Sequence, residues 1–92
     1  MGGLPAHLLL KAFLMTNETS HELDARGLLC PEPIMLLHKA VKTLSPGEVI
    51  HMLASDPSTQ RDVAKFCMFL DFSLIKNNEE EGVYHYWIQK PR

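Results

Sequence analysis

Only two stretches of the sequence carry apolar residues at helical spacing. The presence of no more than two predicted helices limits the fold more than any other feature. Along the first stretch, apolar residues recur every three or four positions at Ile34, Leu37, Val41 and Leu44. This stretch predicts a helix from Pro33 to about Leu44. The second stretch carries its apolar side at Thr59, Val63, Phe66, Cys67 and Leu70. Two helices can cover only one face of a sheet.

Four segments around these helices have the residue types and lengths of strands. They cover residues 20–24, 48–54, 72–76 and 83–89. Residues 77–82 contain turn formers and three successive glutamates, so the last two strands should pair as an antiparallel hairpin. The order βαβαββ predicts a two-layer α/β sandwich with a four-stranded mixed sheet and both helices on one face.

Length and charge restrict the chain to few classes of protein. With 92 residues there is room for one domain, expected over residues 16–92, after an N-terminal extension or loosely ordered arm over residues 1–15. The apolar run in that arm is too short to span a bilayer and lacks the flanks of a signal peptide. The net charge is −2 and neither half of the chain is basic, which argues against direct nucleic-acid binding.

Cysteine usage indicates a reducing compartment. The chain has only Cys30 and Cys67, too few for a disulfide framework, and their separation matches no zinc-ligand spacing. We therefore expect neither a metal nor a bound cofactor. Cys67 falls on the apolar side of the second helix and is interpreted as a core residue.

Cys30 lies where a loop meets the first predicted helix, followed by Pro31, Glu32 and Pro33. The first-turn amides of a helix lack intrahelical partners and the helix dipole adds positive charge, so a thiolate is favoured there. The Glu32 carboxylate acts in the opposite direction and leaves the net effect open. Most free cysteines are small buried hydrophobes, but a residue at a helix entrance beside two prolines is more often exposed.

The two prolines also limit which amides can face the sulfur. Because Pro31 and Pro33 have no N–H, the expected donors are the amides of Glu32, Ile34 and Met35. No second cysteine lies three residues from Cys30, so a dithiol redox couple is excluded. The remaining chemistry is that of one thiol, either nucleophilic attack or the carrying of a group.

Residues 23–33, Leu-Asp-Ala-Arg-Gly-Leu-Leu-Cys-Pro-Glu-Pro, resemble the opening of the TusA/SirA-type sulfur carriers. The signature of that family is Cys-Pro-x-Pro at the start of the first helix. The Pro-Gly-Glu turn at 46–48, the Ala-Ser-Asp-Pro loop at 54–57, the Phe-Cys-Met-Phe run at 66–69 and the alternating aromatic tail also look like the family. Together these motifs cover residues 21 to about 90.

The resemblance implies a small cytoplasmic, monomeric sulfurtransferase that acts stoichiometrically within a relay. It would accept sulfur as a persulfide on Cys30 from a cysteine desulfurase and pass it to a downstream sulfur-relay protein. In the best-known branch the relay ends in tRNA 2-thiouridine, and other branches serve other sulfur or selenium pathways. The pyridoxal phosphate of such a reaction belongs to the desulfurase, and the carrier needs no cofactor.

Six residues are candidates for partner docking. On the predicted helix, Met35, Lys39 and Lys42 share with His38 the side opposite the apolar one, which indicates either a solvated surface or a basic docking surface. The other three match family motifs at the partner-facing end: Arg26, Asp56 and Phe69. Their simpler interpretations are a solvated loop charge, a helix cap and peripheral packing.

Two other functional classes remain open. One is a regulatory or RNA-binding module, because the predicted sandwich resembles RNA-binding folds and fold alone does not give function. The other is a thiol enzyme such as a peroxidase, which would turn over without a protein partner.

Overall fold

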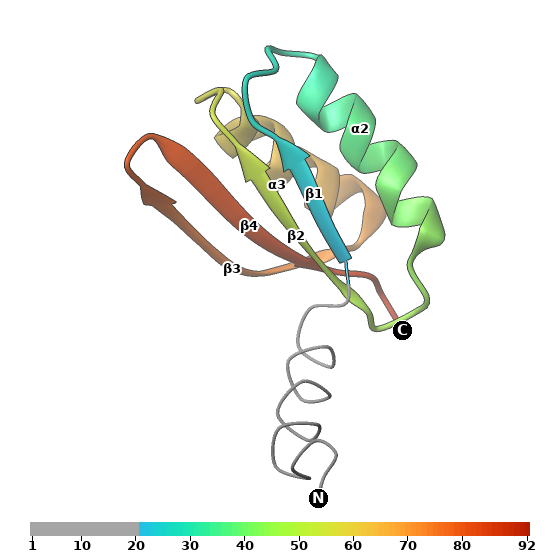
Figure 1. Ribbon diagram of the computed structural model, residues 1–92. Helices are drawn as coiled ribbons and strands as arrows, with labels where there is room; N and C mark the ends of the chain where they lie inside the picture. The colour runs from blue at the N-terminus through green and yellow to red at the C-terminus, as the bar shows by residue number, and fades with distance from the viewer. Residues whose placement is uncertain (1–20) are drawn as a thin grey trace, which may run out of the picture.

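The computed structural model describes residues 21–92, which form one mixed sheet and two helices (Figure 1). The elements in chain order are β1 (His21–Ala25), α2 (Glu32–Ala40), a 3₁₀ turn (Val41–Thr43), β2 (Val49–Ala54), α3 (Thr59–Leu70), β3 (Ser73–Glu80) and β4 (Val83–Gln89). The strand order across the sheet is β1-β2-β4-β3, with β1 and β2 parallel and the other pairs antiparallel. The expected two-layer βαβαββ sandwich is confirmed.

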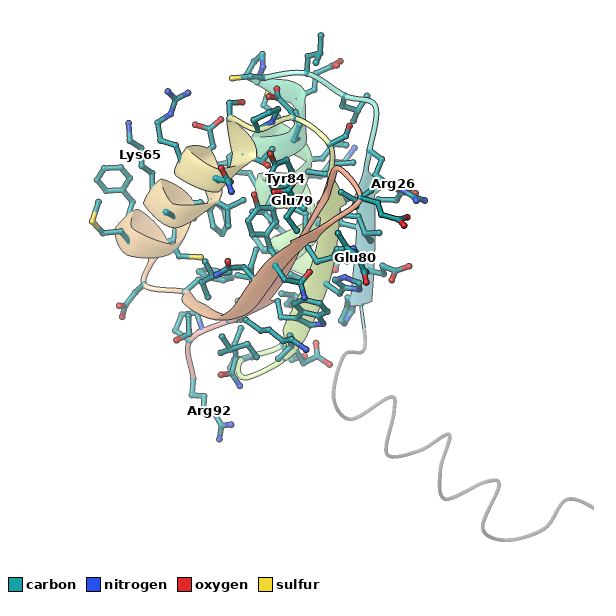
Figure 2. All side chains as sticks on the ribbon, turned by 90° about the vertical axis from the view of Figure 1, so that its left-hand side faces the viewer. Arg26, Lys65, Glu79, Glu80, Tyr84 and Arg92 are labelled. Carbon is teal, nitrogen blue, oxygen red and sulfur yellow. The ribbon has the colours of Figure 1, made fainter. Side chains whose placement is uncertain are left out.

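The two layers are separate in side view, with Lys65 on the helix layer and Arg26 and Glu80 on the sheet layer (Figure 2). Because β1 and β2 run parallel and in register, with Ala25 opposite Ala54, both strands end at the same edge of the sheet. The loops that follow these strands, and the first turns of α2 and α3, therefore lie side by side.

The core lies between the sheet and the helices. Its fully buried side chains include Leu37 from α2, Val63 from α3, and Ile50, Met52 and Ile88 from the sheet. The hydroxyl groups of Thr59 and Tyr86 form a buried hydrogen bond of 2.9 Å, so a polar pair within this layer is satisfied.

The ends of the helices differ from the expected limits. The first α-helix ends at Ala40 and continues as the 3₁₀ turn, after which Leu44 has extended backbone but is still buried. Leu70 was expected on the buried side of the second helix, and this is wrong: it is 42% exposed. It is the last residue of α3, just before the left-handed Asp71, and it lines a groove between α2 and α3 instead of the core.

The hairpin differs most from the sequence expectation. Residues 77–80 were expected to be turn, but they extend β3 and pair with residues 83–86 of β4. Only Glu81 and Gly82 form the turn, with φ of 52° and 80°. Two successive residues with positive φ match the right-handed twist of a tight hairpin, so cross-strand pairing overrides the local turn preference of Asn77 and Asn78.

Residues 1–20 lie outside the described part of the chain, and with them the expected arm over residues 1–15 and the first residue of the expected strand at 20–24. Within residues 21–92 no helix is long and apolar enough to cross a membrane.

Candidate functional site

The loop that carries Cys30 is fastened to the neighbouring loop by side-chain hydrogen bonds. The N–H of Gly27 donates to Oγ of Ser55 at 2.8 Å, and the N–H of Cys30 donates to Oδ2 of Asp56 at 2.7 Å. The other carboxylate oxygen of Asp56 accepts the N–H of Ser58 at 3.0 Å. Asp56 thus holds the backbone at Cys30 and the turn before α3 together.

The electrostatics of Asp56 follow from these contacts. The N–H groups of Ser58 and Cys30 point at its carboxylate and lower the pKa of Asp56 below its ordinary value. The ionised carboxylate accepts the hydrogen bonds from both N–H groups, so backbone donors within the site stabilise its negative charge. Asp56 is therefore a positioning group for Cys30 in this structure, whether or not a partner also contacts it.

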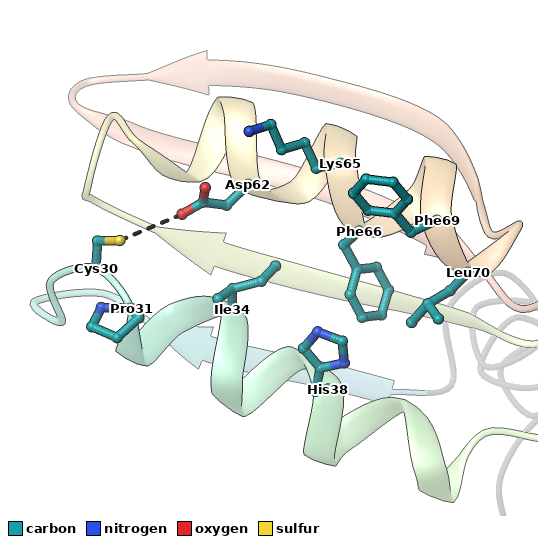
Figure 3. Close-up of a pocket in the computed structure, with 9 residues that line it drawn as sticks. All are labelled: Cys30, Pro31, Ile34, His38, Asp62, Lys65, Phe66, Phe69 and Leu70. Atoms are coloured by element: carbon teal, nitrogen blue, oxygen red, sulfur yellow. Dashed lines mark hydrogen bonds between the residues drawn. The ribbon is translucent and has the colours of Figure 1, made fainter.

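The thiol of Cys30 is exposed and lies across from the first turn of α3. Its S–H donates to Oδ2 of Asp62 over an Sγ–O distance of 3.6 Å (Figure 3). The other oxygen of the same carboxylate accepts Nε of Arg61 at 3.4 Å. The Cys30–Pro31 peptide bond is cis. The sulfur therefore faces a carboxylate from the other helix.

The expected arrangement of helix amides around the sulfur is not the one observed. The N–H of Glu32 donates to the carbonyl of Leu29 at 2.9 Å, and the N–H of Met35 donates to the carbonyl of Pro31 at 3.1 Å. Two of the three amides expected to face Cys30 thus have backbone partners. The tight turn at the start of the helix pairs these amides with backbone carbonyls, so they do not donate to the sulfur.

An apolar groove of about 330 Å³ runs between α2 and α3 and begins at Cys30 (Figure 3). Its lining comprises Cys30, Pro31, Ile34, His38, Asp62, Lys65, Phe66, Phe69 and Leu70. The rings of His38 and Phe66 are in edge-to-face contact, with ring centroids 4.8 Å apart at 72°. The groove has the size and lining to accept an apolar side chain beside the thiol.

The docking candidates differ in their position relative to the groove. Phe69 is 75% exposed and lines the groove that begins at Cys30. Met35 is also largely exposed, but Met35, Lys39 and Lys42 lie outside the groove lining. His38 differs from these three neighbours, because its ring turns toward the groove and contacts Phe66 there.

Arg26 is held at the end of β1 by its neighbour Asp24. Its guanidinium donates to both carboxylate oxygens of Asp24, at 2.8 and 2.7 Å, and this lowers the pKa of Asp24 to about 2. The pair is solvent-exposed, so it fixes the position of Arg26 and adds little to stability.

Cys67 has the opposite surroundings to Cys30. It is only 7% exposed, among the core residues of α3, and burial raises the pKa of its thiol to about 11. A thiol that stays protonated and covered cannot act as an acceptor for a protein-borne group.

Sequence reasoning missed Asp62, the closest polar neighbour of the sulfur, and the groove residues Lys65 and Phe66. The signal that could have found Asp62 is topological. When two successive helices both follow parallel strands, their first turns lie at one edge of the sheet, so an acidic residue in the first turn of α3 lies near a thiol at the start of α2. Among residues 21–92 no group of three or more histidine, cysteine or acidic side chains is arranged to hold a metal ion.

Comparison with known proteins adds to this geometry. The family model described as sulfurtransferase TusA matches residues 21–90. A sulfur carrier protein TusA of Pseudomonas aeruginosa is 51% identical over 76 residues, 83% of this chain and 96% of that protein. The corresponding protein of Pseudomonas entomophila is 56% identical over 68 residues, 74% of this chain and 85% of its own length.

Among solved structures, the chain is similar in fold to a SirA-like protein from Desulfitobacterium hafniense. The TM-score is 0.68 at 22% identity, over 77% of this chain and 97% of that one. The match agrees with the two-layer sandwich described above.

Proposed function

Because this chain belongs to the TusA family, whose relatives are named sulfur carrier proteins, we propose that it carries sulfur as a persulfide on Cys30. The observation that carries the proposal is the exposed thiol of Cys30 at the mouth of the groove between α2 and α3. A carrier must present its sulfur to two different proteins in turn, so the sulfur has to be accessible from outside.

The proposed loading step is a displacement at sulfur. Cys30 loses its S–H proton to solvent, and the thiolate attacks the outer sulfur of a donor protein's persulfide. The donor's S–S bond breaks, its thiolate leaves, and a new S–S bond forms on Cys30. One persulfide and one thiol become one thiol and one persulfide, so no external oxidant or reductant takes part. Delivery to the acceptor repeats the same exchange.

The surroundings of Cys30 support both halves of this exchange. The bond from Cys30 N–H to Asp56 fixes the backbone from which the sulfur projects. The Asp62 carboxylate accepts the S–H of the resting thiol and so directs the sulfur along the groove. Because the groove is apolar, it can take a side chain of the donor or acceptor next to the reacting sulfur and exclude water.

The proposed partners are a cysteine desulfurase as donor and a downstream relay protein as acceptor, in a pathway that ends in tRNA 2-thiouridine. Docking is assigned to Phe69, which lines the groove, and to five residues outside its lining: Arg26, Met35, Lys39, Lys42 and Asp56. A wobble 2-thiouridine measurement in a bacterial host that lacks its own carrier tests the pathway. The wild-type chain should restore the modification and Cys30→Ser should not.

The direct test of the carrier is intact-mass analysis after incubation with a cysteine desulfurase and cysteine. We expect a gain of about 32 Da, one sulfur atom, which dithiothreitol or cyanide removes. Cys30→Ser should abolish the adduct and Cys67→Ser, the matched control, should retain it. An adduct that Cys67→Ser alone removes would contradict the assignment.

The competing RNA-binding class has a separate test. With a net charge of −2 and no basic half, any RNA binding should be weak and steeply salt-dependent. Tight, salt-resistant binding in a filter titration, together with no mass gain from the desulfurase, would favour that class instead.

A further inference from the structure

The face of the sheet turned away from the helices carries a chain of hydrogen-bonded side chains that the sulfur chemistry does not use. Nδ1 of His51 lies 3.1 Å from Oε2 of Glu22, and Nε2 of His51 lies 2.9 Å from Nδ1 of His85. The three residues come from β1, β2 and β4, which are neighbours in the sheet. Strand pairing thus brings two imidazole nitrogens within hydrogen-bond distance of each other.

The hydrogen bonds fix which nitrogens carry protons in this chain. A carboxylate can only accept, so Nδ1 of His51 donates to Glu22 and Nε2 presents a lone pair. That lone pair accepts the Nδ1–H of His85. One proton thus joins Nε2 of His51 and Nδ1 of His85, and each ring has one nitrogen turned toward the other.

Trp87 packs against His51, and Lys76 in turn lies over the Trp87 ring. The rings of His51 and Trp87 stack with centroids 4.3 Å apart and planes within 3°. Nζ of Lys76 lies 4.7 Å from the centroid of the same indole. Because Trp87 is in contact with both a ring and a cation, a nucleotide base would have to displace one of them to stack there. The geometry favours a small ligand between the histidines over a base on the tryptophan.

We propose that His51 and His85 form a two-nitrogen chelate for a divalent transition-metal ion of the Ni²⁺ or Cu²⁺ type. At metal–nitrogen bonds of about 2.1 Å, two nitrogens 2.9 Å apart subtend about 90° at the metal. That is the angle between neighbouring ligands in square-planar and octahedral sites. A tetrahedral ion would need the nitrogens about 3.4 Å apart.

Binding of the metal changes the tautomer of His85. The proton on Nδ1 of His85 passes by way of solvent to Nε2 of the same ring, so His85 stays neutral and no proton is released overall. The two rings then turn until both lone pairs converge on the ion. Glu22 keeps its bond to Nδ1 of His51 and acts as the outer partner that orients the ligand. No third ligand is grouped with this pair within residues 21–92, so water completes the coordination.

The chain reports this site itself, because Trp87 is its only tryptophan. Titration of the full-length protein with Ni²⁺, a probe that does not oxidise Cys30, should quench the Trp87 fluorescence to saturation with one ion per chain. Calorimetry of the same titration gives the affinity independently of the indole.

Three variants test the ligands. His85→Gln removes half of the chelate and should weaken Ni²⁺ binding at least about 100-fold, since two linked ligands exceed one by that factor. Glu22→Gln keeps an exposed surface side chain of the same size and should weaken binding about tenfold. His21→Gln is the matched control on β1 and should leave both the quenching and the affinity unchanged.

The proposal would be overturned if His85→Gln and Glu22→Gln bound Ni²⁺ with equal affinity. It would also be overturned if the wild-type protein showed no quenching of Trp87 up to millimolar Ni²⁺. Far-UV circular dichroism confirms that each variant is folded, and persulfide loading of Cys30 should be the same in all three. A negative result for the metal site therefore does not count against the proposed carrier function. A negative result for the carrier function likewise does not count against the metal site.

Discussion

The two cysteines of this chain show how a position in the fold decides the chemistry of a thiol. Cys30 lies just before α2, exposed, with its S–H on Asp62. Cys67 lies on the buried side of α3, where desolvation raises the pKa of its thiol to about 11. The residue type is the same and both lie in or next to a helix. The difference is one of position. A side chain in the loop before a helix stays exposed to solvent, whereas a side chain on the apolar side of a helix points into the core.

The largest expected effect is a difference in alkylation rate between these thiols. At pH 8 a thiol whose pKa is about 11 is about one part in a thousand thiolate, and Cys67 is also covered. Iodoacetamide should therefore modify Cys30 at least about 100-fold faster, as followed by peptide mass spectrometry. In denaturant Cys67 of the Cys30→Ser protein should react readily. Similar native rates for the two thiols would remove the basis of the comparison.

The same contrast predicts unequal effects of the two substitutions on stability. Cys67→Ser places a hydroxyl among core side chains and should lower the free energy of unfolding by about 1–3 kcal/mol. Cys30→Ser changes an exposed side chain and should stay within about 0.5 kcal/mol. Urea titrations of both proteins measure these values, and equal destabilisation would mean that Cys30 also supports the fold.

A smaller effect concerns the lysines of the first helical segment. Lys39→Glu with Lys42→Glu should slow persulfide transfer from the desulfurase about three- to tenfold at low salt and reduce its salt dependence, because exposed charges act mainly on encounter. Alkylation of Cys30 should barely change. The matched control is Lys76→Glu on the open sheet face, which should leave transfer near the wild-type rate. Unchanged transfer in the double variant would make these lysines a solvated surface, and equal losses in transfer and alkylation would mean that they act on the thiol.

The smallest effect is on the pH dependence of stability through Asp56. Its pKa is lowered in the folded state, so its contribution is fully present above the unfolded pKa of about 3.9 and is lost as pH falls through the folded value. Melting curves should show a smaller loss for Asp56→Asn than for the wild type between pH 5 and pH 3. Parallel curves would indicate that the bonds to Ser58 and Cys30 form equally in the unfolded chain.

The sequence alone was sufficient for the layer architecture and for the separation of the two thiols. Apolar residues at helical spacing placed Leu37 and Val63 in the core, and the stop at Pro46 and Gly47 separated helix from strand. These are local properties, since a helix or strand reveals its buried side through its own periodicity. The motif around Cys30 also identified the family over the part of the chain that the family model matches.

Tertiary structure alone decided what surrounds the sulfur and how the hairpin ends. Asp56 and Asp62 lie 26 and 32 residues from Cys30 and reach it only because two parallel strands end at one edge of the sheet. In the same way, the turn preference of residues 77–80 yielded to cross-strand pairing, and His51 met His85 across β2 and β4. Periodicity along one element shows which side is buried, whereas contacts between elements depend on register and strand direction, which are fixed when the whole sheet assembles.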